Sequence, residues 1–127
     1  MEKVIEKKNV EGGGFLFNHP HFSEIFIPEE FNDEQKMMAN ATQDFIDKEV
    51  IPFADRIDAL EEGLMSSIMT KAGELGLLGV CIPEQYGGLG MSFNTGMLIA
   101  DIVASAGSFT TAYGAHTGIG TLPILYY

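Results

Sequence analysis

The spacing of apolar residues predicts helices over most of the chain from Asn32 onward. Apolar side chains recur every three or four positions, which places them on one face of an α-helix. Asn32 is a good N-cap for the first helix, and Gln35 makes a capping box possible. Pro52 is expected to kink or interrupt this helix. The predicted inward face comprises Met38, Ala41, Phe45, Ile46 and Val50, and Phe53, Ile57 and Leu60 continue the spacing beyond the proline.

The same spacing predicts three further helices. The second spans about residues 64–75 and ends at Gly76. The third spans about residues 92–106 and is apolar nearly all round, which predicts a central position. The fourth begins after Ser108 as its N-cap and runs toward Tyr127, with a kink at Pro123. The inward face of the second helix is predicted to be Leu64, Ile68, Ala72 and Leu75.

The remaining segments lack this periodicity. Residues 77–83 are short and apolar and are expected to be extended, and the glycine-rich residues 84–90 are expected to form a loop. Residues 1–28 are charged, glycine-rich or aromatic without a period, and are predicted to form an irregular arm whose aromatics dock on a core. The prediction is therefore an all-α orthogonal bundle of four or more helices over residues 29–127, preceded by this arm.

The charge is distributed very unevenly along the chain. The net charge is −11, which argues against nucleic acid and against an anionic membrane surface as partners. Residues 1–62 hold 15 of the 18 acidic residues and 6 of the 7 lysines and arginines. The second half is therefore expected to be either unusually well buried or half of a larger core, because small proteins are mostly surface. No apolar run approaches the length of a membrane span.

Small residues form a stripe on the fourth predicted helix. Ala112, Ala115 and Gly118 lie three residues apart and so share one face. Interior glycines cost helix stability, by about 1 kcal/mol each relative to alanine, so close packing should offset them. Either another helix or a thin ligand could lie against this face.

Several motifs in order resemble those of a known family. The segment AGELGLLGVCIPEQYGGLG (72–90) has a helix ending in E-L-G, then V-x-x-P-E and a Y-G-G-x-G loop. GAHTGIGTLPILYY (114–127) follows it, and KEVIPFA lies in the first helix. Together, over about residues 29–127, they resemble the N-terminal helical domain of the acyl-CoA dehydrogenases. GAHTGIGTLPI is most similar to the long- and very-long-chain members.

The resemblance implies a function for a longer enzyme of three domains. Such enzymes oxidise a fatty acyl-CoA to the trans-2-enoyl-CoA in β-oxidation, with FAD held mainly between the other two domains and a catalytic glutamate outside this one. No catalytic residue and no bound FAD are therefore expected in this chain. The N-terminal domain helps to wall the acyl-chain slot. The matching positions here are Thr111, Ala112, Ala115, His116 and Ile119.

The resemblance also implies partners, and it leaves alternatives open. The expected partners are fatty acyl-CoA, the remaining domains, an electron-transfer flavoprotein and further copies of the enzyme. The single cysteine, Cys81, fits a reducing compartment, so a cytoplasmic protein is predicted. One alternative is a related acyl-CoA oxidase-type flavoenzyme. Another is a helical module that binds an apolar ligand or partner without catalysis, its uncharged half serving as the interaction surface.

Other candidate sites have simpler interpretations. His19 and His21 lack a third ligand, so a metal site is not predicted. His116 has no partnered nucleophile nearby in sequence and is interpreted as a hydrogen-bonded residue at the slot wall. GGLGMSFNTG lacks the G-x-G-x-x-G spacing of a dinucleotide loop. The acidic residues between Asp55 and Glu62 are interpreted as a solvated helix face.

Overall fold

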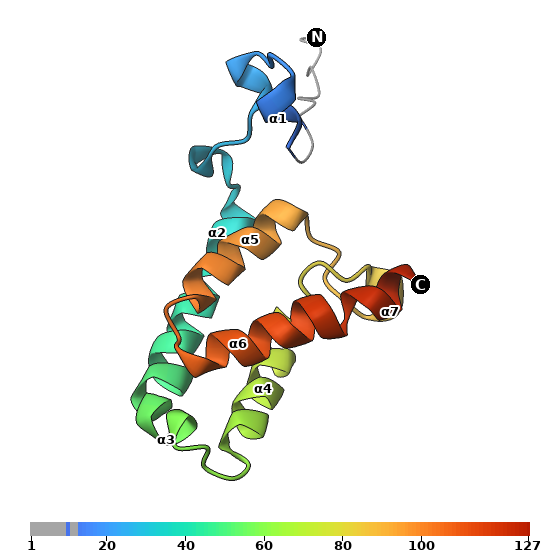
Figure 1. Ribbon diagram of the computed structural model, residues 1–127. Coiled ribbons are helices and arrows are strands. Elements are labelled where there is room, and N and C mark those ends of the chain that lie inside the picture. The colour runs from blue at the N-terminus through green and yellow to red at the C-terminus, as the bar shows by residue number, and fades with distance from the viewer. Residues whose placement is uncertain (1–9, 11–12) are drawn as a thin grey trace. The chain divides into compact units, whose positions relative to one another are not determined.

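The structure is a computed structural model that describes Val10 and residues 13–127. These residues divide into two units, one ending at Asp33 and the other running from Glu34 to Tyr127. All regular elements among the described residues are helical, which confirms the predicted all-α class (Figure 1). Residues 1–9 and 11–12 of the predicted arm lie outside the described part.

The first unit consists of short helical turns. These are α1 (Gly14–Phe17), η1 (Phe22–Glu24) and η2 (Pro28–Glu30). The Phe26 and Phe31 rings meet edge to face with centroids 5.0 Å apart, and the backbone N–H of Val10 donates to the Glu24 carbonyl. The docking of this arm's aromatics on a core stays a prediction.

The second unit begins with a helix that changes type before its proline. The segments are α2 (Asp33–Phe45), the π-helix η3 (Ile46–Val50), the 3-10 turn η4 (Ile51–Phe53) and α3 (Ala54–Asp58). Pro52 lies in the first turn of η4. A proline cannot donate a backbone hydrogen bond and would clash with the carbonyl four residues earlier, so a wide turn ahead of it relieves both problems. The predicted interruption at Pro52 is confirmed.

The buried face of α2 differs in part from the predicted one. Phe45, Ile46 and Val50 are buried as expected, but Ala41 is exposed. Thr42 is fully buried in its place, and its hydroxyl donates to the Met38 carbonyl at 2.8 Å. This hydrogen bond within the helix satisfies the hydroxyl, which is why a polar residue can replace an apolar one in the core.

Gln35 takes a role that its helix position did not indicate. Its side chain is buried, and its amide nitrogen donates to Thr95 Oγ1 at 2.8 Å across to the third predicted helix. Thr95 Oγ1 also lies 3.1 Å from the hydroxyl of Ser92. These polar side chains tie the start of α2 to the start of α5 (Phe93–Val103) through the core.

The helix α4 (Leu64–Glu74) ends as predicted. Gly76 follows it with φ of +77°, a conformation that glycine adopts without strain. Ile68 and Ala72 are buried and Leu64 is half-buried, whereas Leu75 is 52 % exposed, contrary to the prediction. Leu75 lies at the helix C-cap, where the chain already leaves the inward face.

The segment after α4 is not extended. Residues Leu77–Gly79 form the 3-10 turn η5, with Leu77 and Val80 buried three positions apart on one side. The following loop contains η6 (Glu84–Tyr86) and returns to bond this segment: Met91 N–H donates to the Val80 carbonyl at 2.9 Å. The apolar run therefore buries its side chains as a turn, so the expectation of an extended segment was wrong.

A close backbone approach fixes the loop before α5, and a side-chain cap begins α5. A Cβ at Gly88 would lie 2.1 Å from the Ile82 carbonyl oxygen, so this position needs glycine. The Ser92 hydroxyl accepts from Thr95 N–H at 3.4 Å and caps α5. Ile99 is fully buried, but Phe93 is 71 % exposed. The buried residues of α5 lie on one face, so the predicted central position is wrong for the face that carries Phe93.

The last helical segment repeats the arrangement seen before Pro52. It comprises α6 (Ser108–Gly114), the π-helix η7 (Ala115–Gly120) and α7 (Leu122–Tyr126), with Pro123 in the first turn of α7. Within the wide turn, Thr121 N–H donates to the His116 carbonyl five residues earlier. Gly107, not Ser108, occupies the N-cap position, so the predicted cap was wrong.

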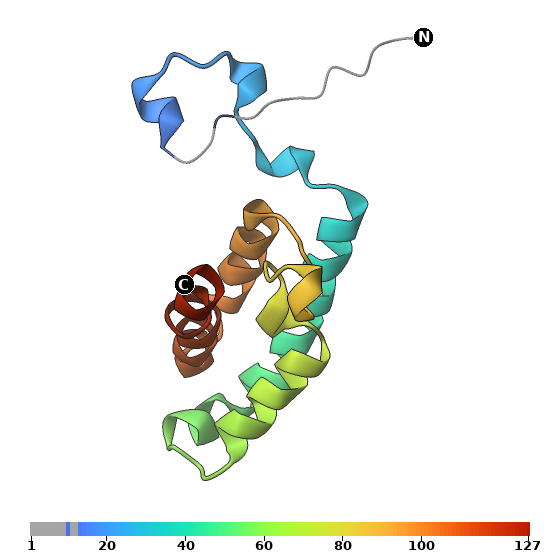
Figure 2. The same cartoon turned by 90° about the vertical axis from the view of Figure 1, so that its right-hand side faces the viewer.

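The second unit is arranged crosswise. The segment α6–η7–α7 runs across the direction of α2 and α4 in Figure 1 and is seen nearly end-on in Figure 2, in keeping with an orthogonal bundle. Phe45 of α2 and Phe109 of α6 lie with ring centroids 5.9 Å apart in the core. The rest of the buried apolar core comes from the helices and from the turns between them: Ile46, Val50, Ile57, Ile68, Ala72, Leu77, Val80, Ile99, Val103, Ala106 and Tyr113.

Candidate functional site

A groove lies between the N-terminal half of α6 and the turn that joins α3 to α4. Its volume is about 570 Å³, and it is open to solvent. We call it the α6 groove. It is lined by Ile57, Leu60, Glu61, Glu62, Gly63, Met65, Ser108, Thr111, Ala112 and Ala115.

The α6 wall of the groove is set by the residues that anchor the opposite face of the helix. Phe109 and Tyr113, four residues apart, are buried on the core side. The Tyr113 hydroxyl donates to the Leu77 carbonyl at 3.1 Å, and burial raises the pKa of Tyr113 to about 12. This anchoring leaves Thr111 and Ala115 exposed and Ala112 half-buried on the groove side.

The opposite wall is a tight helix-ending turn at the end of α3. Leu60 N–H donates to the Ile57 carbonyl and Glu61 N–H to the Arg56 carbonyl, which is the hydrogen-bond pattern of a Schellman motif. Its left-handed position is usually glycine, but here it is Leu60, with φ of +56°. A left-handed conformation costs a non-glycine residue about 1–2 kcal/mol. The prediction that Leu60 continues the inward face was wrong, because its side chain is 88 % exposed.

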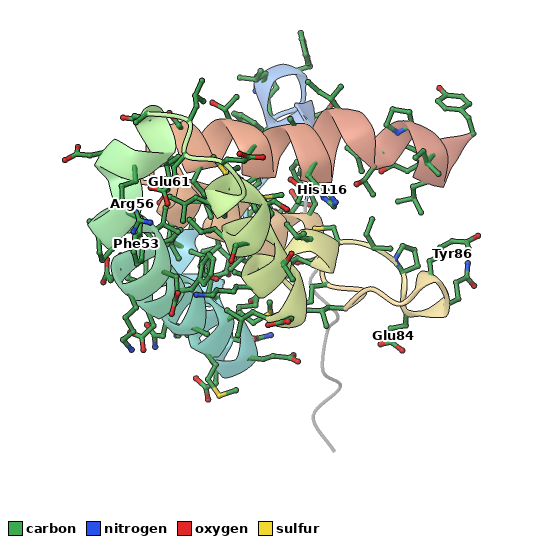
Figure 3. All side chains as sticks on the ribbon, turned by 90° about the horizontal axis from the view of Figure 1, so that it is seen from below. Phe53, Arg56, Glu61, Glu84, Tyr86 and His116 are labelled. Atoms are coloured by element: carbon green, nitrogen blue, oxygen red, sulfur yellow. The ribbon has the colours of Figure 1, made fainter. Side chains whose placement is uncertain are left out.

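Charged side chains brace this turn. Arg56 pairs with Glu61, and the Arg56 guanidinium lies 5.3 Å from the centre of the Phe53 ring (Figure 3). The hydrogen bond and charge of Arg56 lower the pKa of Glu61. The Ser108 hydroxyl donates to Asp58 Oδ1 at 2.5 Å, which links the two walls of the groove. The acidic residues here are thus not only a solvated face.

The five residues predicted to wall an acyl-chain slot fall into two groups. Thr111, Ala112 and Ala115 line the α6 groove. His116 and Ile119 do not, and both are exposed, Ile119 by 83 %. In Figure 3, His116 lies away from Arg56 and Glu61, which mark the turn on the other side of the groove. The His116 carbonyl accepts from the Thr121 hydroxyl at 2.6 Å. The groove ends before Ile119, which is about 6 Å beyond Ala115 along a helix.

The two glycines in the middle of the α6–η7 segment are not packed closely against another part of this chain. A Cβ built at Gly114 or at Gly118 would meet nothing within 4 Å. No helix of the described residues therefore nests against these glycines. Ala115 is exposed and Gly118 is half-buried.

Sequence reasoning missed the second wall of the groove. Ile57 of α3, Leu60 of the α3–α4 turn and Met65 of α4 line this wall, whereas the sequence pattern predicted Ile57 and Leu60 only as part of an inward helix face. A usable signal was Gly63 after two glutamates, which indicates a turn between two helices. That signal locates the turn, but it does not show which distant helix the turn approaches.

Other candidate sites carry no chemistry of their own. The described residues contain no group of three or more histidine, cysteine, aspartate or glutamate side chains placed to hold a metal. His21 Nδ1 lies 2.7 Å from the Ser23 hydroxyl. Burial raises the pKa of the Cys81 thiol, which disfavours a reactive thiolate. None of the helices in the described part is long and apolar enough to cross a bilayer.

The second half, which has few charged residues, leaves large apolar side chains in contact with solvent. Ile124 is 83 % exposed, and Tyr126 and Tyr127 at the end of α7 are also exposed. The second half was expected to be either unusually well buried or half of a larger core, and the first of these expectations is wrong. Further exposed apolar side chains in this half are Leu75, Tyr86, Leu89, Phe93, Met97 and Ile119.

Comparison with known proteins adds a family to this geometry. Residues 32–127 match the family model for the acyl-CoA dehydrogenase N-terminal domain. A probable acyl-CoA dehydrogenase of Bacillus subtilis is 44 % identical over 117 residues, covering 92 % of this chain and 20 % of that protein. A mitochondrial isovaleryl-CoA dehydrogenase of Solanum tuberosum is 30 % identical over 124 residues, covering 94 % of this chain and 30 % of that protein.

A solved structure agrees with the fold. The acyl-CoA dehydrogenase of Bacillus anthracis, solved in complex with FAD, superposes with a TM-score of 0.83 at 43 % identity. The match covers 89 % of this chain and 20 % of that one. The chain therefore spans about a fifth to a third of the length of these relatives.

Proposed function

This chain belongs to the acyl-CoA dehydrogenase family, and from that premise we propose that it is the N-terminal helical domain of an FAD-dependent enzyme of fatty acid β-oxidation. The proposed reaction removes a proton from the α-carbon and a hydride from the β-carbon of a fatty acyl-CoA. The product is the trans-2-enoyl-CoA. The domain's own part is to form one wall of the slot that holds the acyl chain.

The observation that carries this proposal is the α6 groove. Its walls include Thr111, Ala112 and Ala115, which the family resemblance assigns to the acyl slot, and the apolar side chains of Ile57 and Met65. The two alanines leave space that longer side chains would fill. An apolar chain placed there would be removed from water, which is favourable in proportion to the area buried. His116 and Ile119 are proposed to contact the substrate only where other parts of the enzyme complete the slot.

FAD is the proposed cofactor of the full-length enzyme, as in the Bacillus anthracis complex. When bound, FAD supplies the acceptor for the hydride. Among the described residues Lys48, Arg56 and Lys71 are each paired with a carboxylate, which makes these cations a poor fit for its negatively charged pyrophosphate. We therefore expect FAD and the catalytic base to belong to other parts of the enzyme, so that this domain alone is inactive.

The exposed apolar side chains of the second half suggest what covers them. Relatives of this chain are three to five times longer, so the remaining polypeptide of such an enzyme is the proposed partner for Ile119, Ile124 and Tyr126. An electron-transfer flavoprotein is the proposed electron acceptor, and a homo-oligomer is the proposed assembly. The single cysteine fits a reducing compartment, and we propose the cytoplasm.

Two other functions remain as alternatives to test. An acyl-CoA oxidase-type flavoenzyme would use the same groove and pass electrons to oxygen. A non-catalytic module would use the same apolar groove and exposed side chains to bind an apolar ligand or partner. The long- or very-long-chain preference also stays a proposal, since it rests on the resemblance of residues 114–127.

One assay separates these functions. The full-length protein, reconstituted with FAD, is expected to oxidise saturated acyl-CoAs and to reduce an electron-transfer flavoprotein faster than oxygen. Faster turnover with oxygen would indicate the oxidase. Absence of acyl-CoA-dependent flavin reduction with every chain length would reject the enzyme and leave the binding module. Saturable turnover by residues 1–127 with added FAD would contradict the proposal that this domain is inactive alone.

A further inference from the structure

Leu60 occupies a backbone position that glycine would fill at less cost. It is the sole non-glycine residue with positive φ among Val10 and residues 13–127. The hydrogen bonds from Leu60 N–H and Glu61 N–H hold it there, with donor–acceptor distances of 2.9 and 3.1 Å. Local strain of this kind persists when another requirement fixes the residue type, and it is concentrated at functional positions.

Packing within this chain does not supply that requirement. The Leu60 side chain is 88 % exposed, so the strained residue buries little of its apolar surface in the domain itself. The same side chain lines the α6 groove, opposite the α6 wall formed by Thr111, Ala112 and Ala115. A ligand in the groove would therefore remove Leu60 from water, and an apolar ligand would gain most from it.

The charges around Leu60 indicate which end of a ligand could lie there. Glu61 and Glu62 follow it and also line the groove. Arg56 pairs with Glu61 from outside the lining, and among the described lining residues the charged side chains are both carboxylates. This end of the groove therefore disfavours the phosphates of a CoA group and suits an uncharged hydrocarbon end.

We propose that Leu60 is a specificity-determining residue, which contacts the methyl end of an acyl chain long enough to reach the α3–α4 turn. The proposal rests on the function proposed above and adds one residue and one orientation to it. Acyl chains that are too short to reach the turn gain nothing from Leu60. Long chains gain from burying it, so the residue favours long over short substrates.

The test uses the full-length enzyme and the variant Leu60→Gly, assayed with saturated acyl-CoAs from four to twenty carbons. Glycine relieves the backbone strain and removes the apolar contact, so the melting temperature is expected to stay the same or rise. The value of kcat/KM for the longest substrates is expected to fall about tenfold, with short substrates unaffected. The loss should lie in KM, because the contact is remote from the reacting carbons.

A second variant separates the side chain from the backbone. Leu60→Asn also tolerates the left-handed conformation and should show the same selective loss, whereas Leu75→Asn changes an exposed leucine outside the groove and should show none. An unchanged or improved long-chain profile in both Leu60 variants would overturn the proposal while leaving the enzyme function intact. A wild-type enzyme without acyl-CoA activity would reject the proposed function, and this inference with it.

Discussion

Two proline-interrupted helical segments, residues 33–58 and 108–126, use the same backbone device and carry opposite surfaces. In each, a π-helical turn precedes a short helix that has proline in its first turn. In each, the buried side presents an aromatic residue to the other, Phe45 and Phe109. The two segments differ in what they present to solvent.

The solvent-facing side of the first segment carries ion pairs. Lys48 pairs with Asp44 one turn away, and Glu49 pairs with Lys71 of α4. The second segment has no acidic or basic residue except His116, and it exposes Ile119 and Ile124. Both segments contribute side chains to the same core, so they differ in their solvent-facing surfaces and not in how they are buried. The comparison teaches that the first surface is suited to water and the second to contact with more protein or with a ligand.

The largest expected effect compares how much the shared core and the exposed apolar side of the second segment contribute to the free energy of unfolding. Phe109→Ala should lower the free energy of unfolding by about 3–5 kcal/mol, because it leaves a cavity beside Phe45. Ile124→Ala should change it by less than about 0.5 kcal/mol, because Ile124 is largely exposed. Chemical denaturation of both variants measures the difference. A loss of several kcal/mol for Ile124→Ala would show that α7 is part of this core.

A smaller effect tests the groove side of the second segment. Ala112→Leu should fill the space beside Ala115. In the full-length enzyme, kcat/KM for long acyl-CoAs should fall about tenfold, whereas kcat/KM for short acyl-CoAs should be affected less. Ala104→Leu, an exposed site outside the groove, should leave the chain-length profile unchanged. If Ala112→Leu and the wild type had the same chain-length profile, the assignment of α6 to the acyl slot would be rejected.

A still smaller effect sharpens the contrast between glycines that pack and glycines that do not. Gly114→Ala should stabilise the chain by about 0.5–1 kcal/mol, because alanine favours the helix and its Cβ meets nothing within 4 Å. Gly88→Ala should destabilise it, because its Cβ would collide with the Ile82 carbonyl. Thermal unfolding measures both. Destabilisation by Gly114→Ala would mean that this face is already covered.

The smallest effect concerns the charged turn. The pKa of Glu61 is lowered mainly by its hydrogen bond to Arg56, so the pair stabilises the fold above the pKa of Glu61 in the unfolded chain. This contribution is lost as the pH falls through the lowered pKa. Glu61→Gln should therefore reduce the melting temperature slightly at neutral pH, and the difference from wild type should vanish in acid. A difference that grows in acid would contradict this assignment. Since both side chains are largely exposed, salt should also shrink the effect.

The sequence predicted the fold best where one physical signal acted alone. Pro52, Pro123 and Gly76 mark real changes of helix type or direction, because backbone chemistry decides them locally. Predictions failed where tertiary contacts decided. The packing of α2 buries Thr42 in place of Ala41, and the Thr42 hydroxyl is satisfied within its own helix. Ser108 bonds Asp58 fifty residues away in place of capping α6.

One of the two walls of the α6 groove could be predicted from the sequence. The resemblance supplied Thr111, Ala112 and Ala115, and these residues share a helix face that any regular helix would give them. The facing turn could not be found in this way. Leu60 fits a helical apolar pattern in the sequence, and only the left-handed end of α3 turns it outward to the groove.

The two π-helical turns have a consequence for how chains of different length can be matched to this one. Each turn holds one residue more than an α-helical turn, through bonds that reach back five residues. Deleting one residue between Ala115 and Gly120 should therefore give a plain helix that still points Ile124 and Tyr126 the same way. A deletion elsewhere in α6 or α7 would rotate everything after it by about 100°. Gaps in alignments of related chains should therefore fall in these wide turns.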